Sequence, residues 1–418
     1  MGFKKVDLNE IAEITTGFAF KSKEFNTEGK GVRLIRGKNV STDFVRWGDD
    51  TRYWSGDTSN LEDLFLQVDD IVIGMDGSKI GHNYARIKQT DLPALLVQRV
   101  ARLRSNGKIN QKLLYYYINN NDFTRYIMNV KTGTSIPHIS AKQILNYEIN
   151  LPTIRVQENI VSLIEPLVEK IEINKKMINN LDQLSQTLFK QWFIDFEFPN
   201  EEGKPYKSSG GEMVESELGE IPKGWKVFPL YDLAEYINGT SFKKHELQNE
   251  KNDLPIIKIA ELKSGFSGNT KYFIGEKDKK YYLKNGDILF SWSGNPETSI
   301  DTFFWTRGKG ILNQHIFKVV STKYPQQLIY ILLKYFKPTF SRIASNKQTT
   351  GLGHVTVKDL KRLKVVLPLD SSPYVQLNHL GDLILNLNLE NIKLQELRDT
   401  LLPKLLSGEI EIPDDLEV

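Results

Sequence analysis

The stretch Leu8–Glu13 (LNEIAE) occurs a second time, slightly changed, as Leu230–Glu235 (LYDLAE). The same separation along the chain also relates Gly17 to Gly239. Further matches follow in the same order at nearly the same separation: Phe20 with Phe242, Leu34–Arg36 with Ile256–Lys258, Asp70 with Asp287, Gln98 with Gln314, Thr132–Pro152 with Thr350–Pro368, and Leu181–Leu188 with Leu394–Leu401. Chance does not preserve order and spacing over so many residues. The chain is therefore predicted to be an internal duplication.

Both halves follow the same sequence of patterns. Short apolar runs such as Ile71–Ile73 and Ile288–Phe290, bounded by Gly, Asn and Asp, are typical of strands. A helical stretch follows at 111–120 in the first half and 325–336 in the second, and then a polar loop leads to a strand that ends in Leu-Pro. These patterns predict a mixed α/β (α+β) fold in each half.

After each Leu-Pro the apolar spacing changes from about two residues to about 3.5, which is typical of long helices that pack together. The first helix is expected to present Leu167, Asn174, Leu181 and Leu188, with Met177 and Leu184 beside them. The second is expected to present Leu380, Leu387, Leu394 and Leu401, with Leu383 and Leu397 beside them. Neither stripe can be buried alone, so the two helices should pack against each other. Asn174 would fix their register, and Pro166 predicts a kink or a short preceding helix.

The composition sets wider limits. The 418 residues suffice for two or three domains, and the absence of cysteine excludes disulfides and thiolate metal sites. The net charge of +3 is only mildly basic, so charge alone argues weakly for nucleic acid. No signal peptide and no apolar run long enough to cross a bilayer are found, so the expected location is the cytoplasm, away from membranes.

The C-terminal motif Leu401–Gly408 (LLPKLLSG) and the paired openings Gly17–Lys21 and Gly239–Lys243 are the most specific features. With the duplication they make nearly the whole chain resemble the specificity subunits (HsdS family) of type I restriction–modification enzymes. The resemblance implies two target-recognition domains, at 1–152 and 223–368, and two antiparallel spacer helices, at 153–198 and 369–410. A Gly/Ser-rich linker is expected at 199–222 and a tail at 411–418.

The resemblance also implies a function. The chain would read a bipartite double-stranded DNA target, one half-site per domain, and would carry two methyltransferase subunits, with restriction subunits added in the full complex. No cofactor is expected on this chain, whereas S-adenosylmethionine, ATP and Mg²⁺ are expected on the partner subunits. The biological role would be DNA methylation and phage defence.

Polar side chains in loops are the candidates for DNA contact, because base edges are read by Arg, Lys, Asn, Gln, Ser and Thr and phosphates by Lys and Arg. In the first domain they are Lys21, Lys23, Arg36, Lys38, Asn39, Ser78, Lys79, Arg99, Lys131, Thr132, Ser135 and His138. In the second they are Lys243, Lys244, Lys258, Asn295, His315, Lys347, Gln348, Thr349 and His354. Gln98 and Gln314 lie among strand-like residues, where they could instead satisfy buried backbone groups.

Two other classes of function stay open. Asp253, Glu261 and Lys263 resemble a metal-dependent nuclease triad, so a stand-alone DNA-modifying enzyme or nuclease is one alternative. Against it, the repeat aligns Glu261 with Asn39, and no phosphate-binding loop, methyltransferase motif or zinc helix is found. The other alternative is an assembly protein or anti-restriction decoy that keeps the helices without reading DNA. The favoured prediction is a non-catalytic DNA-reading subunit.

Overall fold

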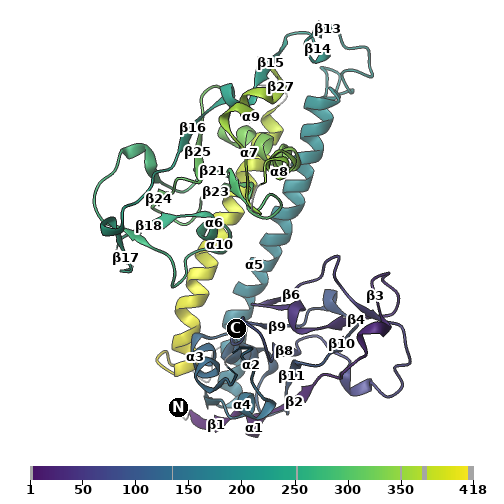
Figure 1. Ribbon diagram of the computed structural model, residues 1–418, viewed down its shortest axis with the longest axis vertical. Coiled ribbons are helices and arrows are strands. Elements are labelled where there is room, and N and C mark those ends of the chain that lie inside the picture. The colour runs from purple at the N-terminus through teal and green to yellow at the C-terminus, as the bar shows by residue number, and fades with distance from the viewer. Residues whose placement is uncertain (1–2, 134, 251–252, 349–350, 370–373, 413–418) are drawn as a thin grey trace. The chain divides into compact units, whose positions relative to one another are not determined.

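The computed structural model describes residues 3–133, 135–250, 253–348, 351–369 and 374–412 (Figure 1). The chain forms two compact units. The first unit takes Met1–Val168 and Glu396–Val418, and the second takes Glu169–Gln395. Each unit is a mixture of strands and helices, as predicted. The tail at 413–418 lies outside the described residues, and the predicted domain boundaries stay predictions.

The first unit is built on two small sheets. One is antiparallel, in the order β2 (Ala12–Thr16), β11 (Val100–Ser105), β8 (Ile71–Gly74) and β9 (Tyr84–Arg86). The other has the order β10 (Ala94–Leu96), β4 (Val32–Ile35), β7 (Tyr53–Trp54) and β3 (Phe25–Asn26), with β10 and β4 parallel. Two further strand pairs are β1 (Lys4–Asp7) with β12 (Glu148–Leu151) and β5 (Val40–Ser41) with β6 (Phe44–Val45). The short helices are α1 (Leu8–Ile11), α2 (Gln111–Ile118), α3 (Asn121–Val130) and α4 (Ala141–Leu145).

The second unit repeats this plan. Its antiparallel sheet has the order β16 (Ala234–Asn238), β25 (Ile316–Ser321), β21 (Ile288–Ser291) and β23 (Asp301–Phe304). Its second sheet has the order β17 (Leu247–Gln248), β19 (Tyr272–Phe273), β18 (Leu254–Ile257), β24 (Gly310–Leu312) and β20 (Tyr282–Leu283). The strand pairs are β15 (Trp225–Pro229) with β27 (Lys364–Pro368), β22 (Ser293–Gly294) with β26 (Gly353–His354), and β13 (Met213–Ser216) with β14 (Gly219–Pro222). The short helices are α6 (Ile259–Ser264), α7 (Gln326–Tyr335), α8 (Lys337–Asn346) and α9 (Val357–Arg362).

The correspondence between the units confirms the duplication. Strands β2, β11, β8 and β9 occupy the same places in their sheet as β16, β25, β21 and β23 in theirs. The parallel pair of β4 and β10 returns as β18 and β24. Even local signals repeat, because Ser140 begins α4 with a capping box and Thr356 begins α9 in the same way.

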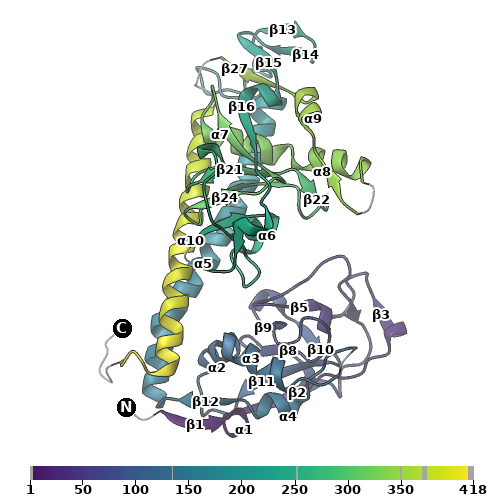
Figure 2. The same cartoon turned by 60° about the vertical axis from the view of Figure 1, so that its left-hand side comes forward.

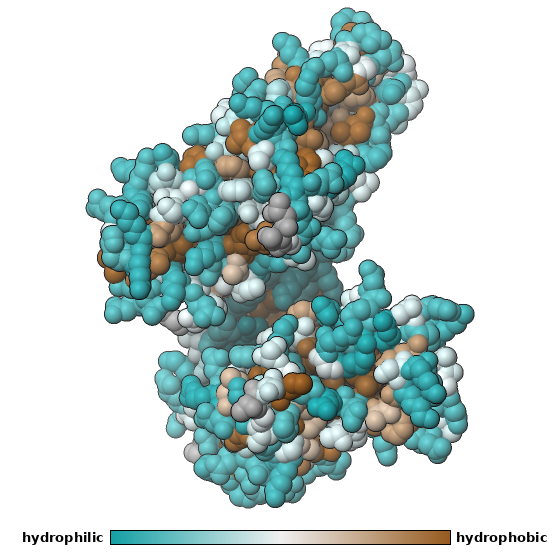
Figure 3. Space-filling model, in the orientation of Figure 1, coloured by the Kyte–Doolittle hydropathy of each residue, from teal (hydrophilic) through white to brown (hydrophobic). Residues whose placement is uncertain are grey.

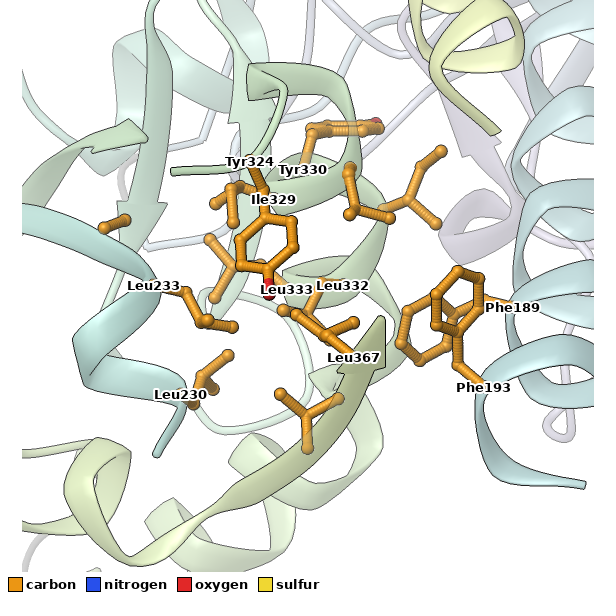
Figure 4. Close-up of a cluster of buried hydrophobic side chains, with 14 of the residues drawn as sticks. Phe189, Phe193, Leu230, Leu233, Tyr324, Ile329, Tyr330, Leu332, Leu333 and Leu367 are labelled. Atoms are coloured by element: carbon orange, nitrogen blue, oxygen red, sulfur yellow. The ribbon is translucent and has the colours of Figure 1, made fainter. Parts of the chain in front are cut away.

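Each unit has its own apolar core. In the first unit, Ile71, Leu103 and Phe123 lie in a cluster that includes the buried face of α2. In the second unit, residues of α7, the strand β27 and the aromatic side chains that follow residue 188 form the largest cluster. Figure 4 shows Phe189 and Phe193 facing Leu332 and Leu367 across this core. The predicted helices at 111–120 and 325–336 therefore exist and supply the core-facing apolar residues.

Two long helices, α5 (Ile154–Phe189) and α10 (Val375–Ser407), each contribute residues to both units. Within the second unit α5 ends on the side where α10 begins, so the two helices run antiparallel there (Figures 1 and 2). Buried seam positions on α5 include Ile171, Asn174 and Ser185, and those on α10 include Ile384 and Asn391.

One detail of the predicted seam is wrong. Met177, Leu184, Leu383 and Leu397 are between 44% and 50% exposed, so they are not seam positions. The second seam row lies four residues after the first row rather than three, and on α5 it runs through Ile171, Ile178 and Ser185. Both spacings occur in a heptad pattern, and the leucines at the three-residue spacing suggested the wrong one.

Two interruptions suggested by the sequence take a different form in the structure. Helix α5 continues through Pro166, so there is no separate short helix before it. Proline removes one backbone hydrogen bond, and the buried Ile160 and Ile164 on the same helix offset that loss by packing into the core of the first unit. The expected linker at 199–222 contains the β13–β14 hairpin, and Phe198 and Ile221 at its ends are buried in the core of the second unit.

Hydrophilic residues cover most of the face shown in Figure 3. Among the described residues, none of the helices is both long enough and apolar enough to cross a membrane.

Candidate nucleic-acid interface

Four loops of the first unit meet at one edge of its sheets. They follow β4 (36–39), follow β8 (75–79), connect β10 to β11 (97–99) and precede α4 (131–140). Backbone hydrogen bonds join them: the Gly77 N–H donates to the Pro137 carbonyl at 3.0 Å and the Met75 N–H to the Arg99 carbonyl at 2.9 Å. Loops that are far apart in sequence are thus held as one surface.

Between the first three of these loops and residues 19–25 lies an open hollow of about 630 Å³, which the described residues of the loop before α4 do not line. Five of its lining residues were predicted as DNA contacts. They are Arg36, Lys38, Ser78, Lys79 and Arg99. Its described lining also includes Arg46 and Gln98, with Asp76 as the acidic residue. Cationic side chains therefore outnumber carboxylates around the hollow, as an acceptor-rich nucleic acid would require.

Carboxylates and carbonyls outside the hollow orient its cations. Lys38 Nζ lies 2.6 Å from Asp50 Oδ2, and the Arg36 guanidinium donates to the Asp50 carbonyl at 2.7 Å. The hydrogen bond from Lys38 holds the pKa of the Asp50 carboxyl below its ordinary value. Burial, with the nearby charge of Arg52, lowers the pKa of Arg36. Ordered cations with partial burial suit recognition better than freely moving surface lysines do.

The other candidates of the first unit lie around this hollow or close to it. Lys21 and Lys23 are exposed on the segment that contains the lining residue Ser22. Thr132, Ser135 and His138 are exposed on the loop before α4, where Thr132 Oγ1 lies 3.0 Å from His138 Nε2, and Lys131 beside them is half-buried.

Asn39 departs from the expectation. Its side chain is fully buried, accepts a hydrogen bond from the Arg36 N–H at 3.2 Å and donates to the Arg46 carbonyl at 3.0 Å. It holds the loop in shape and is not available to a ligand in this conformation. Arg46, which it positions, was missed because its place on the hollow depends on this loop and not on a local motif.

The second unit arranges its candidates on the equivalent loops. The pairing of β22 with β26 places Ser293 beside His354, as Asp76 pairs with His138 in the first unit. The Trp292 and His315 rings lie 5.7 Å apart. Exposed candidates in this unit are Lys243, Lys244, Lys258, Asn295, His315, Gln348 and His354. Lys347 is half-buried in an ion pair with Asp359, and Thr349 lies outside the described residues.

Gln98 and Gln314 are exposed, so the suggestion that they satisfy buried backbone groups is wrong. Gln98 lines the hollow, and Gln314 lies beside His315 with their side-chain nitrogens 3.4 Å apart. Both glutamines occupy the same place in the repeat, and this was the signal in the sequence for a role that the two units share.

The carboxylate of Glu261 is used for structure. Glu261 is buried, accepts hydrogen bonds from the Lys258 N–H at 3.1 Å and from Thr270 Oγ1 at 3.0 Å, and caps α6. Asn39, with which the repeat aligns it, has the same capping role in the other unit, a role that the sequence did not predict for either residue. Across the described part of the chain, no group of three or more His, Cys, Asp or Glu side chains is placed to hold a metal ion. The arrangement gives no support to the nuclease alternative.

The family model for the type I restriction modification DNA specificity domain matches residues 1–183 and again residues 222–398. The chain is 28% identical over 318 residues to the type I restriction enzyme MjaIX specificity subunit of Methanocaldococcus jannaschii, which covers 72% of this chain and 69% of that relative. It is 24% identical over 389 residues to the MjaVIII specificity subunit of the same organism, covering 89% and 86%. A solved type-I restriction-modification S subunit from M. genitalium has the same fold, with a TM-score of 0.50 and 15% identity over 99% of this chain and 97% of that one.

Because the two family matches together cover most of the chain, it belongs to the family of type I restriction–modification specificity subunits. The two separate matches coincide with the two halves of the duplication.

Proposed function

We propose that the chain reads a bipartite double-stranded DNA target for a type I restriction–modification complex, with one half-site bound by each unit. The observation that carries this proposal is the repeated set of loops. Each unit brings the same loops to one edge of its sheets, yet fills them with different polar residues, as Arg99 and Asp76 differ from His315 and Ser293. Equivalent loops that carry different side chains suit two half-sites that differ in sequence.

The long helices suit the role of spacer and scaffold. Because α5 and α10 each contribute residues to both units, they connect the two readers along two separate stretches of chain. We propose that two methyltransferase subunits dock on this chain and that restriction subunits complete the complex. The chain itself is proposed to be non-catalytic, with S-adenosylmethionine, ATP and Mg²⁺ bound by the partner subunits.

The test is to produce the full chain together with its methyltransferase partner in a host without other adenine methylation, and to map methylated adenines across the genome. The proposal predicts a split motif, two short specified blocks separated by unspecified bases. A single continuous motif would contradict the two-reader proposal. Methylation with no motif, or none despite a stable complex, would favour the assembly or decoy alternative.

A matched pair of variants separates reading from folding. Lys79→Ala removes an exposed cation from the hollow, and Lys142→Ala removes an exposed cation on α4 that does not line it. If the hollow binds DNA, Lys79→Ala lowers affinity and reduces the slope of log K against log salt by about one. Lys142→Ala is expected to leave both unchanged, and equal effects of the two variants would argue against DNA in the hollow.

A further inference from the structure

A turn closed by the same backbone hydrogen bond occurs once in each unit, between β10 and β11 in the first and between β24 and β25 in the second. In the first unit the Val100 N–H donates to the Val97 carbonyl at 3.1 Å. In the second, the Ile316 N–H donates to the Asn313 carbonyl at 3.3 Å. The two residues inside each turn are Gln98 and Arg99 in one unit and Gln314 and His315 in the other. Position 99 is therefore equivalent to position 315.

A glycine holds each turn against the neighbouring strand. The Gly17 N–H donates to the Val100 carbonyl at 3.0 Å, and the Gly239 N–H donates to the Ile316 carbonyl at 3.1 Å. A Cβ at Gly17 would lie 2.2 Å from the Val97 carbonyl oxygen, and one at Gly239 would lie 2.1 Å from the Asn313 carbonyl oxygen. A residue with a Cβ could not make this approach without a shift of the backbone, so both turns are packed against a glycine for the same steric reason.

The residue types on this common platform differ. In both turns the first residue is an exposed glutamine, whereas the second is arginine in one unit and histidine in the other. The second residue also differs in backbone conformation, because Arg99 has a positive φ and His315 does not. The two turns thus share their closing hydrogen bond and their glycine contact, and differ in the exposed residue that they present, which suits readers of different bases.

Arg99 has the features of a base-reading side chain. It lines the hollow, its side chain is 60% exposed, and its NH1 lies 3.2 Å from Asp76 Oδ2. Its backbone has a φ of 70°, which is unusual for a residue other than glycine and holds the side chain at the tip of the turn. The contact with Asp76 orients the guanidinium fork, which can donate two parallel hydrogen bonds to O6 and N7 of a guanine.

We propose that positions 99 and 315 are equivalent base-selecting positions, with Arg99 recognising a guanine in one half-site and His315 selecting the base at the matching position of the other. This inference rests on the proposed function. It names, in addition, the pair of residues that makes the two half-sites differ.

The test uses the full chain with its methyltransferase partner and compares the methylation motifs of the wild type, Arg99→His and His315→Arg. Arg99→His should remove the guanine preference at one position of one half-site, weakening discrimination there by about 5- to 150-fold, and leave the other half-site unchanged. His315→Arg should shift one position of the other half-site toward guanine. Histidine tolerates a positive φ better than most residues, so the first variant keeps the turn.

A second measurement changes the DNA instead of mapping the motif. Replacing that guanine with 7-deazaguanine removes the N7 acceptor, and this should weaken wild-type binding but not binding by Arg99→His. A motif unchanged in both variants, or a uniform loss of affinity for all sequences, would overturn the inference and assign Arg99 to phosphate. A wild type without a split motif would instead overturn the proposed function, so the two failures are distinguishable.

Discussion

At the scale of single residues, buried polar side chains fix the loops that carry the candidate DNA-contacting residues. Asn39 in the first unit and Glu261 in the second use their side chains to cap the loop after the parallel strand, at Arg36 and at Lys258. Both are buried, although one is neutral and the other acidic. The repeat therefore keeps a hydrogen-bonding role while it changes the residue type, and Arg36 and Lys258 are presented by the same local geometry.

The close approach at Gly239 gives a direct stability prediction. Gly239→Ala would force its Cβ to within 2.1 Å of a backbone oxygen, so the strand or the turn must move. We expect a loss in the free energy of unfolding of about 1–3 kcal/mol, measured by urea denaturation of the full chain. The control is Gly268→Ala, where a Cβ would meet nothing within 4 Å. If both variants are equally stable, the close approach of Gly239 to the turn is not a feature of the protein.

A buried carboxylate in the first unit gives a pH-dependent prediction. Glu165 on α5 accepts from Arg86 at 2.9 and 3.1 Å and lies 3.0 Å from Lys112 Nζ. Burial alone would raise the pKa of Glu165, but the hydrogen bonds from Arg86 and Tyr116 and the charge of Arg86 outweigh it, so the pKa is below its ordinary value. Since the folded-state pKa is depressed, this stabilisation is fully present above the ordinary pKa of a glutamic acid, about 4.3, and is lost as pH falls below it through the folded-state pKa.

Glu165→Gln should therefore cost about 3–5 kcal/mol in the free energy of unfolding at pH 7, because the largely buried guanidinium of Arg86 loses the charge of its nearer carboxylate and keeps only Asp69, 3.6 Å away. Urea denaturation as a function of pH should show the gap to the wild type narrowing below about pH 4. Glu158→Gln, at an exposed position of the same helix, should change stability by less than about 0.5 kcal/mol. A constant gap at all pH values would mean that the charge of Glu165 is not what stabilises the unit.

At the scale of elements, the helix pair of the second unit combines apolar packing with one buried polar layer. Asn174 of α5 donates from Nδ2 to Glu390 Oε2 at 2.7 Å and to Asn391 Oδ1 at 3.1 Å on α10. Within the described residues its own Oδ1 has no hydrogen-bond partner. Such a layer costs stability and favours one register over its neighbours, because any slip leaves both asparagines buried opposite leucine or isoleucine.

Asn174→Leu is expected to destabilise the chain by about 1–3 kcal/mol, since it leaves the buried Asn391 without its donor. The double variant Asn174→Leu with Asn391→Leu should recover most of this loss, because both polar groups then leave the seam. A double-mutant cycle on urea unfolding measures the coupling. Additive losses would show that the two asparagines do not act as a pair.

Many of the strands and helices could be predicted from the sequence. Repeated apolar runs predicted β8 and β21, and leucines seven residues apart predicted α5 and α10, because burial imposes those periods directly. The second seam row was wrong by one residue, since spacings of three and four both occur in a heptad. The β13–β14 hairpin was hidden because Gly and Ser mark turns inside folded segments as well as linkers.

The candidate site was predictable in part. Loop positions such as Arg36, Lys79 and Arg99 follow from the repeat and from residue type, and the structure brings them to one hollow. The burial of Asn39 and the place of Arg46 depend on hydrogen bonds between residues seven apart in a loop, for which no periodic pattern exists. Glu165 gave no signal either, because its partners come from β9 and α2, distant in sequence.

At the scale of the whole molecule, the chain is two copies of one domain, which agree in strand order and differ in the exposed residues of their loops. Sheet order, the parallel pair, the capping boxes and the glycine-held turns recur in both units. The central claim is that each copy reads its own half of the DNA target independently of the other.

Exchange of one reader tests this claim most directly. Residues 1–150 of the full chain are replaced by the corresponding segment of a relative with a different motif, and methylated adenines are mapped after co-expression with the methyltransferase partner. The account predicts that one half of the split motif changes to the donor's sequence while the other half stays as it was. A change in both halves, or in neither, would contradict it.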